Sequence, residues 1–239
     1  MEWLGFVVLA LAVAAVCAVL VLVAVLEHRR VSELRAECLR RGWTYRAEDL
    51  SLVDRWTAGP FGTGQTRRAR HVVSGRNGDR AFLAFEYSYK RSSGSGDQRR
   101  TTTYRFTVCT LGLPVPLPML RVDPEGWVSR FTDAVGIMDQ VDVESEAFNR
   151  AFAVRATDRK FAYDVLHPRH LELLLAGDRM GWWIEGTEIL SSAERRLDLG
   201  RVDGTLTGLA RVVDQIPGFV WRDRGYDPDG PSPQPRSAK

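Results

Sequence analysis

The sequence has few of the residues from which metal centres and disulfide frameworks are built. It contains 3 cysteines and 4 histidines in 239 residues. Cys17 lies within an apolar run, Cys38 and Cys109 are isolated, and no pair has the CxxC spacing. A disulfide scaffold is therefore not expected, and a reducing compartment is the simpler interpretation. His167 and His170 are close in sequence, but without a third histidine or a cysteine pair nearby we expect no metal site.

The chain also lacks the short motifs of cofactor binding and catalysis. It contains no GxGxxG pattern and no Gly-Lys-Ser/Thr step, so Gly62-Thr63-Gly64 is interpreted as a turn into a strand rather than as a phosphate loop. No nucleophile with an adjacent base is recognisable. We expect no cofactor, and the question of enzymatic activity stays open with the balance against it.

Only one long hydrophobic run is present, and it lies at the start of the chain. Residues 4–26 contain no charge, proline or asparagine, and Glu27-His28-Arg29-Arg30 closes the run. As a helix this run would be about 34 Å long, enough for a hydrocarbon core of roughly 30 Å. A cleaved signal peptide would need a basic start, a shorter apolar core and a small-residue cleavage site, whereas Glu2 stands at the start here. We predict a transmembrane anchor over residues 1–26, with the lipid bilayer as its partner.

The basic residues around this run predict its orientation. No lysine or arginine precedes the run, whereas several arginines follow it closely. These membrane-flanking residues are Arg29, Arg30, Arg35, Arg40 and Arg41. Because positive residues flanking a span stay on the cytoplasmic side, we expect a single-pass protein of the cell membrane with its N-terminus outside and its C-terminal domain in the cytoplasm.

The anchor is expected to continue as a juxtamembrane helix over residues 27–42. No breaker interrupts this segment, and Val31, Leu34 and Cys38 recur at helical spacing before Gly42 offers a C-terminal cap. The weak apolar stripe is too short for a coiled coil.

Charge is unevenly divided along the rest of the chain. Between Glu27 and Thr110 there are 17 Lys and Arg against 9 Asp and Glu, and beyond Thr110 there are 16 against 20. Basic residues near an anionic leaflet gain about 1 kcal/mol each, so the proximal half is expected to approach lipid head groups. The candidate contacts with an anionic partner are Lys90, Arg91, Arg99 and Arg100. The alternative is that these charges only form a solvated face.

Residues 43–123 have the pattern of an antiparallel sheet. Asn77-Gly78 between residues 69–75 and 80–90 predicts a β-hairpin with positive φ at both of its turn residues. Residues 102–111 form a further strand. In the strand 80–90 the apolar residues alternate with polar ones, which predicts one covered face and one face in water. The proline-rich residues 113–120 predict a rigid connector along an edge.

The distal half predicts short helices and strands. Helices are expected near residues 124–134, 158–166, 168–176 and 206–216, and strands near 151–155 and 181–190. We therefore expect an α+β fold, with one N-terminal transmembrane helix followed by a mostly antiparallel sheet domain packed with several short helices. That domain covers residues 43–225, with 43–123 and 124–225 as conceivable sub-lobes. The proline-rich residues 226–239 predict a disordered tail.

Several motifs resemble those of a bacterial family. The segment Glu144-Ser-Glu-Ala-Phe-Asn-Arg150, followed by Phe152, Val154, Asp158 and Leu166-His-Pro-Arg169, resembles the signature of the domain-of-unknown-function family 3137. Gly59-Pro-Phe61 and Phe85-Glu-Tyr-Ser-Tyr89 are similar to membrane-anchored members, so the resemblance covers about residues 60–185. It implies a membrane-anchored bacterial protein and brings no established activity.

Polar residues of this signature are the candidates for a pocket. They are Glu144, Asn149, Arg150, His167 and Arg169. A carboxylate, an imidazole and a guanidinium in one cleft could perform acid–base chemistry or hold a phosphate. Equally, Asn149 could satisfy buried backbone and Arg150 could pair with a nearby carboxylate. Convergence of these side chains would favour a site, and separation would favour structural roles.

Three hypotheses about function follow. The first is a membrane-anchored interaction or scaffold module that faces the cytoplasm close to the inner leaflet and binds an unknown protein or lipid partner. The second is a membrane-tethered enzyme acting on a small or phosphorylated substrate. The third is nucleic-acid binding through the basic, tyrosine-containing strands near residues 87–105, for which the sequence carries no strong signal.

Overall fold

The computed structural model describes residues 2–94, 99–126 and 138–230. A single helix, α1, spans Glu2–Arg40. Its described part is long and apolar enough to cross a membrane, and none of that part is buried within the protein. This helix fits a single-pass membrane anchor. The anchor and the juxtamembrane helix predicted separately are one continuous helix, because no proline or glycine interrupts the chain where the arginines begin.

The end of α1 has the geometry expected of a glycine C-cap. Gly42 has a φ of +68°, the Gly42 N–H donates to Leu39 O and the Trp43 N–H donates to Cys38 O. This pair of hydrogen bonds is the Schellman motif. The chain divides into two compact units, Met1–Tyr45 and Arg46–Lys239, so the boundary falls shortly after this cap.

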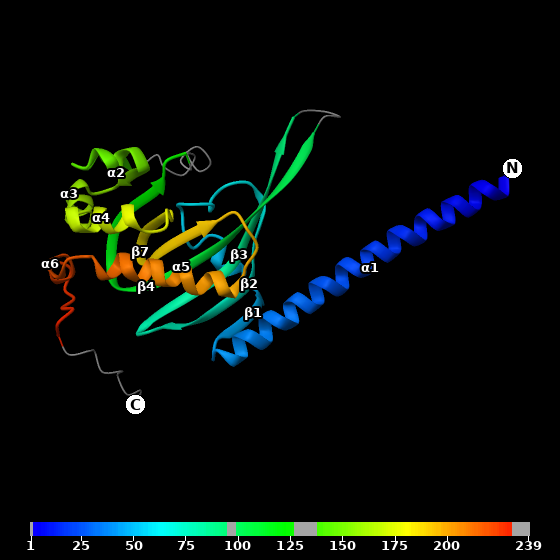
Figure 1. Ribbon diagram of the computed structural model, residues 1–239, viewed down its shortest axis with the longest axis horizontal. Helices are drawn as coiled ribbons and strands as arrows, with labels where there is room; N and C mark the ends of the chain where they lie inside the picture. The colour runs from blue at the N-terminus through cyan, green and yellow to red at the C-terminus, as the bar shows by residue number, and fades with distance from the viewer. Residues whose placement is uncertain (1, 95–98, 127–137, 231–239) are drawn as a thin grey trace. The chain divides into compact units, whose positions relative to one another are not determined.

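The α+β class predicted from the sequence is confirmed. Seven strands form an antiparallel sheet with the order β1-β2-β3-β4-β6-β5, and β7 pairs with β4. The strands are β1 (Thr44–Glu48), β2 (Gln65–Asn77), β3 (Arg80–Ser93), β4 (Arg100–Pro124), β5 (Asp139–Gln140), β6 (Phe152–Ala156) and β7 (Trp182–Ala193). The helices after α1 are α2 (Glu146–Ala151), α3 (Arg159–Val165), α4 (Pro168–Ala176), α5 (Leu199–Asp214) and α6 (Gly218–Arg222) (Figure 1).

The predicted hairpin is present as β2 and β3, but its turn lies one residue later than expected. Asn77 pairs with Arg80, which leaves Gly78 and Asp79 as the two turn residues. Only Gly78 has a positive φ, of +64°. A glycine at the first central position is the requirement of a type II′ turn, so the expectation of positive φ at both turn residues was wrong.

The proline-rich segment is also different from the prediction. It is part of β4, a long strand that pairs with β3, β6 and β7 rather than running along an edge. Pairing with β3 stops at Leu111, and the register with β7 shifts between Gly112 and Leu117. The prolines of this segment therefore lie where the ladder is interrupted, so their missing N–H groups cost no ladder hydrogen bond.

The sheet is covered on both faces, which corrects the expectation of one face in water. On one face Phe85 and Tyr87 contact a segment of residues 50–63, which we call the strap. Phe61 of the strap is fully buried, with its ring centroid 4.7 Å from that of Tyr87. On the other face, α5 packs on β4 and β7, as Figure 1 shows, and Phe82 and Ala84 are buried. The polar residue in this second face, Glu86, accepts a hydrogen bond from the Leu197 N–H at 2.8 Å.

Two glutamates of β7 hold the strap in place. The Glu185 carboxylate accepts hydrogen bonds from the backbone N–H groups of Thr57 at 2.7 Å and Ala58 at 3.2 Å. Glu188 accepts one from Trp56 Nε1 at 3.0 Å. The strap then enters β2 through Gly62 and Gly64, whose positive φ values agree with the interpretation of these glycines as a turn.

The distal elements follow the prediction with shifted boundaries. Asp158 caps α3 by accepting from the Phe161 N–H, and Pro168 opens α4 at its first turn. The last long helix begins earlier than expected, because Asp198 caps α5 at its N-terminus. Residues 127–137, which include most of the predicted helix 124–134, lie outside the described residues.

The chain remains ordered through the start of the predicted tail. Tyr226 lies 6.1 Å from Trp221, measured between ring centroids, and its N–H donates to Trp221 O at 3.1 Å. The description ends at Gly230, and the rest of the predicted tail lies beyond the described residues. Residues 46–230 belong to one unit, without a division near residue 124.

Candidate functional site

The strands β3 and β4 extend beyond their neighbours as a two-stranded ribbon. Pairing of β2 with β3 reaches only Lys90, and pairing of β7 with β4 begins at Thr107, whereas β3 and β4 continue to pair as far as Ser93 and Arg100. We call residues 88–93 and 100–105 the basic ribbon. Figure 1 shows it projecting from the rest of the sheet.

The register fixes which face of the ribbon each basic side chain occupies. Lys90 lies opposite Thr103 and Arg105 lies opposite Ser88, so Lys90 and Arg105 share one face. Arg91 lies opposite Thr102 and Arg100 lies opposite Ser93, so Arg91 and Arg100 share the other face. The ribbon therefore carries two exposed cations on each side.

The predicted anionic-partner residues are thus brought together. Lys90, Arg99 and Arg100 are exposed and form no ion pair within the described residues. Exposed cations without a local carboxylate retain their charge for a partner, because no intramolecular pair neutralises them.

Aromatic stacking stiffens the base of the ribbon. The ring of Tyr89 stacks on Tyr104 at 5.2 Å and on Phe106 at 5.9 Å, measured between centroids. Cross-strand aromatic pairs of this kind stabilise a two-stranded ribbon, which is otherwise marginal in water. Tyr89 is 4% exposed and burial raises its pKa. Because this ring is covered, it offers no open surface on which a nucleic-acid base could stack.

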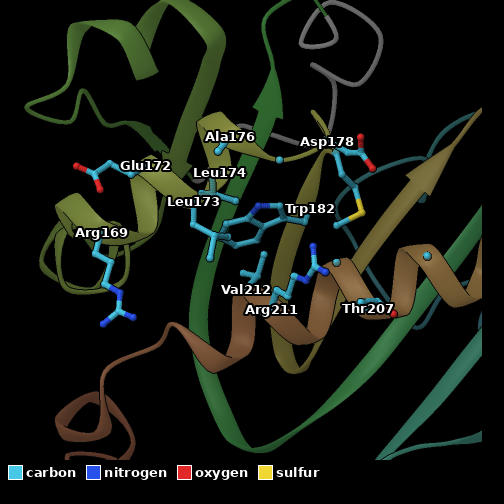
Figure 2. A pocket seen from close by; sticks show the side chains of 14 residues that line it. Arg169, Glu172, Leu173, Leu174, Ala176, Asp178, Trp182, Thr207, Arg211 and Val212 are labelled. Carbon is cyan, nitrogen blue, oxygen red and sulfur yellow. The ribbon is translucent and has the colours of Figure 1, made fainter.

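A second surface feature is a groove of about 810 Å³ between α4 and α5. Arg169, one of the predicted pocket residues, lines it, with Arg211 on the facing helix. Figure 2 shows Trp182 of β7 between the residues of the two helices. Trp182 is fully buried, so the exposed lining consists mainly of small and charged residues.

Beneath the groove lies a buried histidine. His170 stacks on Trp182 with 6.3 Å between ring centroids, and its Nδ1 is 2.8 Å from Val165 O. Burial lowers the pKa of His170 to about 4, so the ring is neutral at physiological pH and Nδ1 donates to that carbonyl. This assignment gives His170 a structural role in the packing between α4 and β7.

The other predicted pocket residues occupy separate local arrangements. Asn149 bonds both backbone polar groups of Val143, with its Oδ1 3.1 Å from the N–H and its Nδ2 2.8 Å from the carbonyl oxygen. Arg150 pairs with Glu146 across one helical turn at 3.3 Å, and both side chains are exposed. His167 Nε2 lies 3.1 Å from Gln215 O, and Glu144 is exposed.

These contacts match the structural alternatives rather than a shared cleft. Asn149 satisfies backbone and Arg150 pairs with a carboxylate, whereas Arg169 alone among the predicted pocket residues lines the groove. No cluster of metal-ligating side chains occurs among the residues that the structure describes. The described arrangement contains no recognisable nucleophile and base pair.

The membrane-flanking arginines lie in the last turns of α1. Arg30 pairs with Glu27 at 3.3 Å, and Arg40 and Arg41 both contact Glu37. The Arg41 guanidinium also lies 4.8 Å from the ring centroid of Trp43. Arg29 and Arg35 are exposed, and Arg35 lies over the ring of Tyr45.

One member of the ribbon, Arg105, was not among the predicted contacts. Its place became clear only from the register of β3 and β4, which puts it beside Lys90. The alternation of residues 102–111 assigns Arg105 to a face of its own strand, but alternation does not say which face of the neighbouring strand it joins.

Comparison with known proteins gives one similar fold. No family model matches the chain, and no curated protein matches it. Among solved structures, the crystal structure of the mycobacterial trehalose monomycolate transport factor A, TtfA, matches with a TM-score of 0.59 and 15% sequence identity. The match covers 78% of this chain and 96% of the TtfA chain. At this identity the likeness shows a shared fold and nothing about activity.

Proposed function

We propose that this protein is a membrane-anchored interaction module whose α+β domain faces the cytoplasm and works close to the inner leaflet. The observation that carries the proposal is that one chain joins a helix of bilayer length to a sheet with a projecting basic ribbon. The arginines after the apolar run support the orientation through the positive-inside rule. A tether of this kind raises the local concentration of the domain at the membrane.

The fold similarity supports a role beside a membrane transport system. The matched structure is titled a transport factor, and a single spanning helix cannot by itself enclose a pathway across a bilayer. We therefore infer an accessory protein that binds other components rather than a transporter. The motifs described above also support membership of the bacterial family 3137, as part of the same proposal.

The membrane-tethered enzyme is less well supported. Its candidate residues are engaged in local contacts, with Asn149 on the backbone of Val143 and Arg150 on Glu146. Nucleic-acid binding is also less well supported, because Tyr87 and Tyr89 are buried in the core beside the strap.

Topology and partners can be tested on the full chain. An alkaline phosphatase fused after Lys239 should be inactive, because this enzyme folds only outside a reducing cytoplasm. Activity of that fusion would overturn the orientation.

Partners can be recovered with a proximity-labelling enzyme at the same position. The matched control is the labelling enzyme fused after Tyr45, which retains the membrane helix and lacks the sheet domain. We expect a set of proteins enriched by the full chain over this control. Equal labelling by both fusions would overturn the interaction module.

A further inference from the structure

The distribution of charge on the basic ribbon restricts how it can meet a partner. Lys90 and Arg105 point to one side of the ribbon, and Arg91 and Arg100 point to the other. A flat anionic surface lying against either face would reach one pair and leave the second pair directed into water. An approach along the length of the ribbon brings both pairs into the same layer of anions.

The ribbon also has the shape for such an approach. Residues 91–93 and 100–102 pair only with one another within the described residues, so no third strand widens this end of the sheet. A hydroxyl pair, Ser92 and Thr101 at 3.0 Å, bridges the two strands there. Serine, threonine and basic side chains can all donate hydrogen bonds to phosphate oxygens.

The same features weigh against edge-to-edge pairing with a second copy. An antiparallel β4–β4 contact centred on Thr103 would place Arg105 of each copy beside Thr101 of the other and gather the cations of both ribbons in one place. Basic residues on an exposed edge are a known device against such pairing. The charge therefore favours an anionic occupant.

We propose that the basic ribbon enters the anionic head-group layer of the membrane end-on, with lipid phosphates contacting both of its faces. This inference rests on the proposed function, because the α1 anchor confines the domain to the neighbourhood of a leaflet. A lipid surface is favoured over an acidic protein because the chain itself carries a bilayer-length helix. Anionic lipid supplies a dense array of phosphates that can surround a narrow ribbon from both sides.

The test uses the full chain in lipid nanodiscs and measures amide hydrogen exchange in residues 91–93 and 100–106. One set of discs contains phosphatidylcholine alone, and the other contains about 30% phosphatidylglycerol, a composition chosen to give the negative surface potential that attracts basic residues. We expect exchange in the ribbon to slow by about tenfold in the anionic discs and to recover in about 500 mM salt, where exposed charges are screened. Equal exchange in the two kinds of disc would overturn the proposal.

Paired charge reversals then distinguish the directions of approach. The variant Lys90→Glu/Arg105→Glu changes one face and Arg91→Glu/Arg100→Glu changes the other. End-on entry predicts that both variants lose most of the lipid-dependent protection. The matched control Arg169→Glu/Arg211→Glu makes the same change of charge in the groove between α4 and α5 and should keep the protection.

Loss from only one ribbon variant would show a face-on contact and overturn the end-on geometry, and loss from the control as well would reveal non-specific attraction. The glutamine variants Lys90→Gln/Arg105→Gln and Arg91→Gln/Arg100→Gln give the same comparison with less disturbance of folding. Protection in neutral discs only after a soluble acidic protein is added would assign the ribbon to a protein partner instead. Such results leave the proximity-labelling experiment unaffected, so failure of the lipid contact is separable from failure of the proposed function.

Discussion

Replacing Gly59 of the strap by alanine should strongly destabilise the sheet domain. Gly59 has a φ of +78°, and a Cβ built on it would lie 2.7 Å from Cη2 and 2.8 Å from Cζ2 of Trp183. Trp183 is 1% exposed, so its ring has no open space into which to move. A non-glycine residue in the left-handed region costs about 1–2 kcal/mol, and overpacking of a filled core costs a further 1–3 kcal/mol or so. We expect Gly59→Ala to lower the free energy of unfolding by about 3 kcal/mol.

A second glycine of the same strap separates the two contributions. Gly62 has a similar φ of +73°, but a Cβ there would meet only Thr57 O, at 3.9 Å. Gly62→Ala should therefore cost only the backbone strain, about 1–2 kcal/mol. In a domain of this size each kcal/mol lowers Tm by roughly 2–4 °C.

Thermal unfolding of the full chain in detergent micelles, followed by tryptophan fluorescence, would compare the two variants. A similar loss of Tm in both would show that the contact with Trp183 has no energetic weight, and would refute the packing argument. The comparison holds the backbone strain nearly constant, because both residues occupy the left-handed region.

Three further predictions concern buried polar and titratable groups. Glu188→Ala should leave Trp56 Nε1 buried without an acceptor and destabilise the domain by about 2 kcal/mol, and an unchanged unfolding curve would contradict this. Because the pKa of His170 is lowered to about 4 in the folded chain, the unfolded chain binds more protons between that value and pH 6.5, so stability should be full above pH 6.5 and fall by about 2 kcal/mol on going from pH 7 to pH 5. His170→Asn should flatten this dependence of Tm on pH, and an equal slope would refute the assignment. Burial raises the pKa of the Cys109 thiol to about 12, so maleimide should label Cys109 only after unfolding, as mass spectrometry of peptides would show.

Local signals in the sequence predicted several features of the fold. The apolar run and the absence of breakers predicted α1, and Gly42 ends this helix with the hydrogen bonds of a Schellman motif. Asp158 and Pro168 begin their helices as their residue types require. These features were predictable because each depends on residues only a few positions apart.

Features that depend on distant segments were not predictable in the same way. The turn register at Asn77 and Gly78 is set by the whole β2–β3 ladder, which selects a type II′ turn over the alternative. The second covered face of the sheet requires α5, which lies more than a hundred residues further along the chain. Alternation in β3 identified which residues share a face, but it contained no information about what would pack there.

The same division applies to the candidate sites. The composition of residues 90–100 predicted a basic, exposed segment, whereas the placement of Arg105 beside Lys90 needed the register of β3 and β4. The pocket candidates around Asn149 were chosen by residue type, and residue type cannot distinguish a catalytic amide from one that bonds the backbone of Val143.

The motifs that resemble family 3137 have clear structural roles in this fold. Phe61 of Gly59-Pro-Phe61 contacts Tyr87 of the second motif, with Gly59 lying under the ring of Trp183. Asn149 holds the backbone of Val143 at the start of α2. Residues with such roles identify an architecture, because their substitution would first disturb folding. Function should therefore be sought on the basic ribbon, whose exposed cations contribute little to the core and can change charge without unfolding the sheet.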